Sequence, residues 1–133
     1  MTIDDALVVY LKAYTGLSDL VVARVFPEEL PQGTTLPAVT YFTVSDYPLH
    51  TLDGQDELAR PLIQFTALGE TRSSVNAVGA QIRLALNDYQ GTLSGLTIQK
   101  IELQNDIPDL LTTADGTTRM FSEDLEYEVD YER

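Results

Sequence analysis

The sequence predicts an α+β domain in which two helices pack on one face of a mixed, mainly antiparallel β-sheet, giving two layers. Two segments, near residues 3–15 and 72–89, repeat apolar residues at helical spacing. The segments between and after them are rich in β-branched and aromatic residues, and the last alternates between apolar and acidic residues. The chain has 133 residues, so we expect a single domain spanning residues 1–133.

The first helix is expected to follow Thr2, a good N-cap residue with Asp5 three positions later. Gly16 provides the expected C-terminal stop. Residues 17–19 then form a short connection, and residues 20–26 lead through a turn into a brief strand. This strand should end at a loop over residues 27–37, which holds three of the six prolines.

Two strands are expected next. Residues 38–44 combine β-branched and aromatic side chains, and Pro48 ends this strand. A loop over residues 48–57 leads to a strand over residues 58–68, in which Pro61 indicates an edge position or a bulge. Its apolar face consists of Ile63, Phe65 and Ala67.

The second helix is expected between Thr71 and Tyr89, with a connector over residues 91–95. The strand over residues 96–103 changes the parity of its apolar positions, which predicts a bulge between Ile98 and Ile101. A polar loop should cover residues 105–118, before a strand over residues 120–132 with one buried face. A neighbouring copy could pair with either edge of such a sheet.

The composition excludes several classes of chemistry. The chain has no cysteine, which excludes disulfides and thiolate metal sites, and it has one histidine. Its formal net charge of −13 disfavours nucleic-acid binding by charge neutralisation. No apolar run approaches the ~20 residues needed to span a bilayer. The acidic N-terminus differs from a signal peptide, so we expect synthesis in a cytoplasm, and we expect no membrane contact and no cofactor.

The acidic face of the last strand is one candidate site. Its carboxylates lie at alternate positions, roughly 6.5–7 Å apart, which is too far to chelate one metal ion without partners from elsewhere. The face is either a solvated strand surface or a negative wall that faces a pore or a basic partner. Its candidate residues are Asp124, Glu126, Glu128 and Asp130.

The loop over residues 45–60 is the second candidate site, because apolar and polar residues mix there. It is either a solvent loop or a contact to another subunit or a partner. Its candidate residues are Tyr47, Leu49, His50, Leu52 and Asp53. A catalytic role for His50 would need a nucleophile that the sequence does not fix. Residues 91–95 lack the Gly-Lys-Ser/Thr ending of a phosphate-binding loop.

In the order of these segments and the turn residues between them, the chain resembles the tail terminator (tail completion) family of long-tailed bacteriophages, prophages and gene transfer agents. The resemblance covers about residues 3–131. It rests on the order and spacing of several short segments. These are Arg24-Val25-Phe26-Pro27, Leu30-Pro31-Gln32-Gly33, Leu36-Pro37-Ala38-Val39-Thr40-Tyr41, His50-Thr51-Leu52-Asp53-Gly54, Gln64-Phe65, Leu84-Ala85-Leu86-Asn87-Asp88-Tyr89-Gln90-Gly91 and Glu128-Val129-Asp130-Tyr131.

The resemblance implies a non-enzymatic structural protein of the virion, assembled in the host cytoplasm. It implies a homohexameric ring at the head-proximal end of the tail, at the head–tail junction. The ring would stop growth of the tail tube protein and join the tail to the head connector or stopper protein. DNA would pass through its pore without sequence-specific binding.

Two other functions are compatible with the sequence. The first is a minor tail or neck adaptor of the same particle. The second is a small hydrolase that uses a carboxylate-bound divalent metal; the acidic excess permits this function, and no motif supports it.

Overall fold

The structure is a computed structural model that describes residues 2–48, 58–112 and 119–132. Its helices are α1 (Ile3–Ala13), α2 (Thr15–Val21) and α3 (Arg72–Leu86). Its strands are β1 (Val25–Pro27), β2 (Ala38–Pro48), β3 (Leu58–Gly69), β4 (Gly91–Leu93), β5 (Leu96–Thr112) and β6 (Arg119–Glu132).

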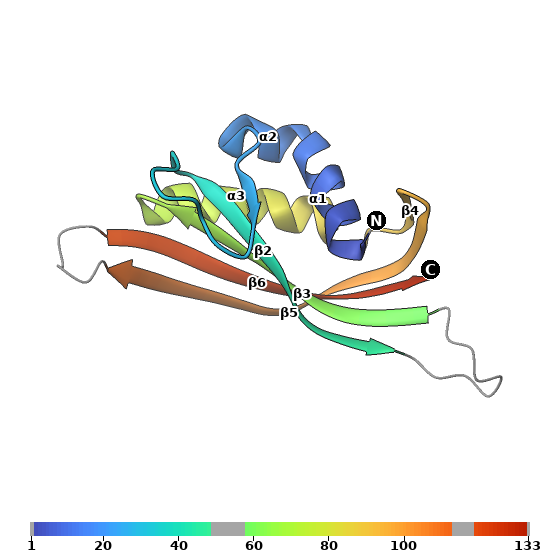
Figure 1. The fold of residues 1–133 in the computed structure, drawn as a ribbon. Helices are drawn as coiled ribbons and strands as arrows, with labels where there is room; N and C mark the ends of the chain where they lie inside the picture. Colours follow the sequence, from blue (N-terminus) through green and yellow to red (C-terminus); the bar gives the residue numbers. More distant parts are fainter. Residues whose placement is uncertain (1, 49–57, 113–118, 133) are drawn as a thin grey trace.

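The six strands form one mixed sheet in the order β1-β2-β3-β6-β5-β4. β1 pairs with β2 in parallel, and every other neighbouring pair is antiparallel. The helices lie on one side of this sheet, which curls and twists (Figure 1). The α+β class and the mixed, mainly antiparallel sheet are confirmed. The predicted number of helices is wrong, because the described part of the chain has three, and the sheet on which they lie is curled.

The two longer helices begin at the predicted caps. The hydroxyl of Thr2 accepts a hydrogen bond from the backbone N–H of Asp5, and Thr71 caps Ser74 in the same way at 3.1 Å. These side chains satisfy backbone donors that have no partner inside the helix. The predicted stop at Gly16 is wrong. α1 ends at Ala13, and Gly16 lies inside α2, where a side chain would collide with Gln81 of α3.

Pro61 predicted either an edge position or a bulge, and the edge position is wrong, because β3 lies between β2 and β6. The β3–β6 pairing is interrupted there, because Ala59 pairs with Tyr131 and the next registered pair is Leu62 with Glu128. Proline has no N–H to donate to a neighbouring strand, which explains the interruption. The predicted bulge in β5 is confirmed by a register shift between Ile98 and Lys100.

The predicted loop over residues 105–118 is wrong over most of its length. β5 continues to Thr112 and pairs with β6 from Arg119 onward, while residues 113–118 lie outside the described part. Residues 104–110 are all exposed, so they lack the apolar alternation by which a half-buried strand is recognised. The ends of β5 and β6 extend past the helices on one side of the molecule, and those of β2 and β3 extend on the other (Figure 1).

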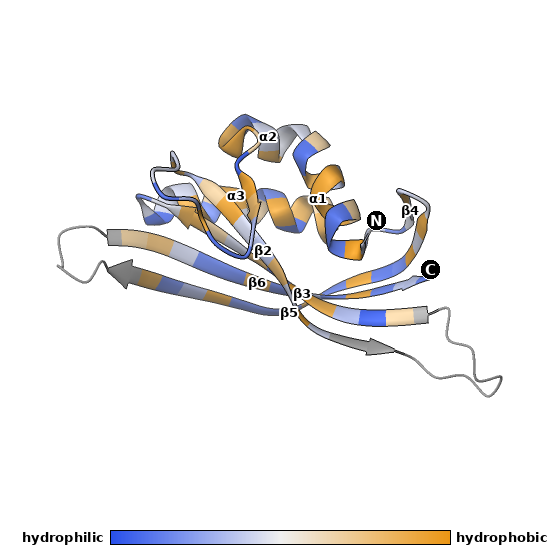
Figure 2. Ribbon diagram, in the orientation of Figure 1, coloured by the Kyte–Doolittle hydropathy of each residue, from blue (hydrophilic) through white to orange (hydrophobic). Residues whose placement is uncertain are grey.

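The core lies between the helices and the sheet. Apolar and polar residues alternate along the strands, as Figure 2 shows. The predicted apolar stripe of α3 and the predicted apolar face of β3 are both buried. The largest fully buried side chains include Tyr127, Phe65, Leu7, Leu11, Leu17 and Ile82. No helix in the described part of the chain is long and apolar enough to cross a membrane.

Candidate functional site: the open face of the sheet

The acidic row of β6 lies on the face of the sheet that the helices leave uncovered. Asp124, Glu126, Glu128 and Asp130 are half-buried and alternate with the buried residues Leu125, Tyr127 and Val129. β6 lies between β3 and β5, so the row runs along the middle of the open face. The predicted alternation of this strand is confirmed.

Each carboxylate of the row has a polar partner on a neighbouring strand. The hydroxyl of Thr66 donates to Asp124 Oδ1 at 2.9 Å, and Asn105 Nδ2 donates to Glu126 Oε2 at 3.1 Å. These contacts fix the side chains across the sheet, so the row is an ordered surface.

Arg60 of β3 contacts the other two carboxylates of the row, Glu128 and Asp130. Arg60 Nε lies 2.8 Å from Asp130 Oδ1 and 3.3 Å from Glu128 Oε1. The hydrogen bond to Asp130 raises the pKa of Arg60. Arg60 and Asp130 belong to the interrupted part of the β3–β6 pairing, so this side-chain contact joins the two strands where the registered pairing is broken.

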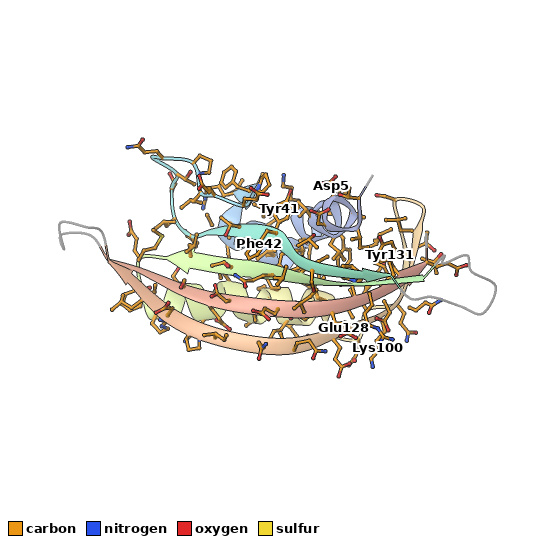
Figure 3. All side chains as sticks on the ribbon, turned by 60° about the horizontal axis from the view of Figure 1, so that its bottom comes forward. Asp5, Tyr41, Phe42, Lys100, Glu128 and Tyr131 are labelled. Atoms are coloured by element: carbon orange, nitrogen blue, oxygen red, sulfur yellow. The ribbon has the colours of Figure 1, made fainter. Side chains whose placement is uncertain are left out.

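The open face is net negative even with its two cations. Lys100 lies beside Glu128 on the exposed side of the sheet (Figure 3) and pairs with Glu102 at 3.0 Å. Among the side chains that the structure describes, the face between Asp124 and Asp130 carries two cations, Arg60 and Lys100. It carries five carboxylates: the four of the row and Glu102, whose strand partner is Glu128. The formal charge of this region is 2 − 5 = −3.

The second predicted site lies largely outside the described residues. Leu49, His50, Leu52 and Asp53 fall in residues 49–57, so their role stays a prediction. Tyr47 belongs to β2, where Arg60 is its registered partner, and its assignment to a loop is wrong. The β-rich run of residues 38–44 continues through Pro48, because β3 offers pairing partners over that length.

A second charged cluster lies on the helix side and was not predicted. Arg83 of α3 places Nη1 2.6 Å from Glu123 Oε1 and 2.9 Å from Asp106 Oδ2. Glu123 is buried against α3, and a Cβ on Gly79 would lie 2.5 Å from Glu123 Oε2. Burial raises the pKa of Glu123, and the hydrogen bond with Asp106 also raises it, while Arg83 opposes both. The sequence offered one indication of this cluster: the alternation of β6 places Glu123 on the same face of the strand as the apolar residues Phe121 and Leu125.

Arg72, at the N-terminal end of α3, also contacts β5 and β6. It donates from Nη1 to the carbonyl of Ser122 at 2.8 Å and from Nη2 to the carbonyl of Asp109 at 2.6 Å. Its guanidinium also lies over the ring of Phe121, 5.1 Å from the centroid. Two arginines of α3 therefore fasten β5 and β6 to the helix layer.

Within the described ranges, no three histidine or acidic side chains gather closely enough to hold a metal ion. The fold is a small α+β domain that presents a helix layer on one side and an acidic face of the sheet on the other. The sequence matches the family described as "Tail completion protein gp17" over residues 5–129. The chain therefore belongs to this family of phage tail proteins, which confirms the resemblance and gives the chain a structural role in a tail.

A solved structure supports the fold. A chain of the "Virion of native gene transfer agent (GTA) particle" superposes with a TM-score of 0.76, covering 98% of this chain and 95% of that chain. The two sequences are 18% identical, so the likeness shows a shared fold. No curated protein matches the chain at a significant level.

Proposed function

We propose that this chain forms a closed homo-oligomeric ring, a hexamer, at the head-proximal end of a long phage-like tail. The ring ends polymerisation of the tail tube protein and joins the tail to the head connector or stopper protein. It acts without catalysis or a cofactor, is assembled in the bacterial cytoplasm, and resides at the head–tail junction of the virion. Membership of the tail completion family supports this role.

The mechanism rests on shape. A ring built from one kind of subunit has two different ends, and only one of them needs to match the end of the tube. The other end presents a different surface, so no further tube subunit binds there, and the head connector docks instead. A rigid domain suits this task, because a flexible one would lose entropy on each docking step.

The observation that carries the proposal is the ordered acidic row on the open face of the sheet. In a ring with this face toward the pore, six copies would contribute 6 × −3 = −18 formal charges to the wall. DNA would be repelled from such a wall and would slide without adhering. Salt limits this repulsion to about 8 Å at physiological ionic strength, so it acts on DNA that approaches the wall closely.

Light scattering after size-exclusion chromatography tests the ring. A hexamer of this 14.7 kDa chain has a mass of 6 × 14.7 = 88 kDa. We expect this mass in concentrated solution, or rings on tube ends after purified tail tubes are added. A chain that stays at 14.7 kDa and binds no tube end would contradict the proposal.

A further inference from the structure

The two long edges of the sheet are open over much of their length. Among the described residues, β1 pairs only with Val39–Tyr41 of β2, which leaves residues 42–48 without a strand on that side. At the other edge, β4 pairs only with Leu96–Ile98 of β5, which leaves residues 99–112 open. A strand edge with free N–H and C=O groups is a template for pairing with another chain.

The open stretch of β5 carries some of the usual protecting devices, because Lys100 and Glu102 are charged and Pro108 has no N–H, and apolar side chains are exposed beside them. Proteins normally block an edge with charges or inward-pointing polar groups. Here four of the seven large apolar side chains that are exposed in the described part of the chain lie on the open stretches. They are Phe42 and Val44 on β2, 37% and 44% exposed, and Ile107 and Leu110 on β5, 48% and 44% exposed.

The strand directions decide which edges can meet in a ring. β2, β3, β6 and β5 are antiparallel in succession, so β5 runs opposite to β2. A rotation about a ring axis preserves the direction of each strand relative to that axis. The β2 edge of one copy, placed beside the β5 edge of the next, would therefore continue the antiparallel alternation without a break. Such a head-to-tail contact can close into a ring, whereas pairing of two β5 edges about a two-fold axis gives only a dimer.

We infer that residues 42–48 of one copy pair with the open stretch 99–112 of β5 in the next copy, so that the sheets of neighbouring copies join. The exposed apolar residues of the two edges are buried in this contact. The helix layer takes no part in the pairing, and the acidic rows of all copies then share one continuous surface. This inference rests on the proposed ring and names the contact that closes it.

The absence of cysteine from the chain makes a crosslinking test clean. Val44→Cys is combined in turn with Asn105→Cys, Ile107→Cys and Leu110→Cys, to allow for different registers, and each variant is oxidised at a concentration at which light scattering shows the ring. We expect at least one pair to give a ladder of dimers, trimers and larger species on a non-reducing gel. Each single-cysteine variant should remain at the monomer position.

The possible failures are distinguishable. If light scattering shows the mass of the ring and none of the three cysteine pairs gives crosslinked species, the edge pairing is overturned and the proposed ring stands. Dimers from Ile107→Cys alone would show a two-fold β5–β5 contact and would also overturn it. A chain that forms no ring, with or without tubes, would overturn the inference together with the proposed function.

A charge variant provides a second measurement. Ile107→Lys places a charge on the β5 edge and should lower the fraction of chain in the ring at least tenfold. Val9→Lys makes the same charge change at a residue of α1 that is 54% exposed, and should leave that fraction unchanged. Equal ring fractions in the two variants, each with the melting temperature of the parent, would count against the pairing.

Discussion

Tyr127 of β6 is the largest of the fully buried side chains, and its hydroxyl has no hydrogen-bond partner among the described residues. Burial raises the pKa of this phenol, so the group stays neutral at physiological pH. Tyr10 of α1 is a natural comparison, because its hydroxyl donates to the carbonyl of Ala85 at 2.9 Å. Removing the hydroxyl of Tyr10 therefore breaks a hydrogen bond, whereas removing the hydroxyl of Tyr127 breaks none among the described residues.

Replacing Tyr127 with phenylalanine should increase stability. Tyr127→Phe removes a buried hydroxyl without a partner, which should raise the free energy of unfolding by about 1 kcal/mol. Tyr10→Phe removes a hydroxyl that has one and should lower it by about 1 kcal/mol. Urea denaturation of both variants checks this, and a loss of stability in Tyr127→Phe would show that the hydroxyl is satisfied.

Glu123 gives the protein a pH-dependent contact. Its folded-state pKa is raised above its ordinary value, first by burial and then by Asp106, while Arg83 opposes the shift. Removing Arg83 should raise this pKa further. The folded state would then bind the proton more tightly than the unfolded state, so stability would fall as the pH rises through the raised value.

Arg83→Gln should therefore destabilise the protein most near neutral pH, by about 2 kcal/mol, because it leaves a buried carboxylate without its cation. The loss should shrink as the pH falls toward 4 and Glu123 is protonated. Arg60→Gln breaks an exposed pair that solvent screens, and should destabilise the protein less than Arg83→Gln does at neutral pH. Denaturation at pH 4, 5.5 and 7 checks both, and a loss in Arg83→Gln that is equal at all three values would contradict this explanation.

Among the elements, those with strong local signals were predicted and those defined by their neighbours were not. Thr71 and the apolar stripe that follows it predicted α3, and strict alternation predicted β6. The sequence over residues 15–21 is too short to show a helical period, and α2 packs against α3, with Gly16 beside Gln81. The outer half of β5 is exposed on both faces, so only its pairing with β6 makes it a strand.

The cap of α3 is testable by itself. Thr71→Ala removes the hydroxyl that accepts from the N–H of Ser74, and should lower the free energy of unfolding by about 1 kcal/mol. Thr71→Ser keeps an acceptor at the same position and should change it by less than half as much. Similar losses in the two variants would show that the threonine methyl group, and not the cap, is responsible.

Local sequence patterns also decided which part of the candidate site could be predicted. The acidic row could be found because a strand period of two places its residues on one face. Its partners, Arg60, Thr66 and Asn105, come from strands far apart in the sequence, and no local pattern links them. The Arg83–Glu123–Asp106 cluster depends on the register of β5 and β6 and on the position of α3, so it required the fold.

For the whole molecule, the open acidic face should matter for DNA passage and not for assembly. A variant with Asp124→Asn, Glu126→Gln and Glu128→Gln should form rings with the normal mass, and its particles should deliver DNA more slowly and with lower infectivity. A control with Asp19→Asn, Glu29→Gln and Glu70→Gln makes the same charge change at exposed positions off the β6 row. Normal DNA delivery in the first variant would argue against a pore-facing row.

Particle imaging would show where this chain lies in the virion. Averaged electron micrographs of particles that carry this chain should resolve the junction between head and tail. We expect a ring of six copies at the last layer of the tail tube, with the sheets toward the channel and the helices outward. A junction without this chain, or copies found only elsewhere in the particle, would rule out the proposed ring at the head–tail junction.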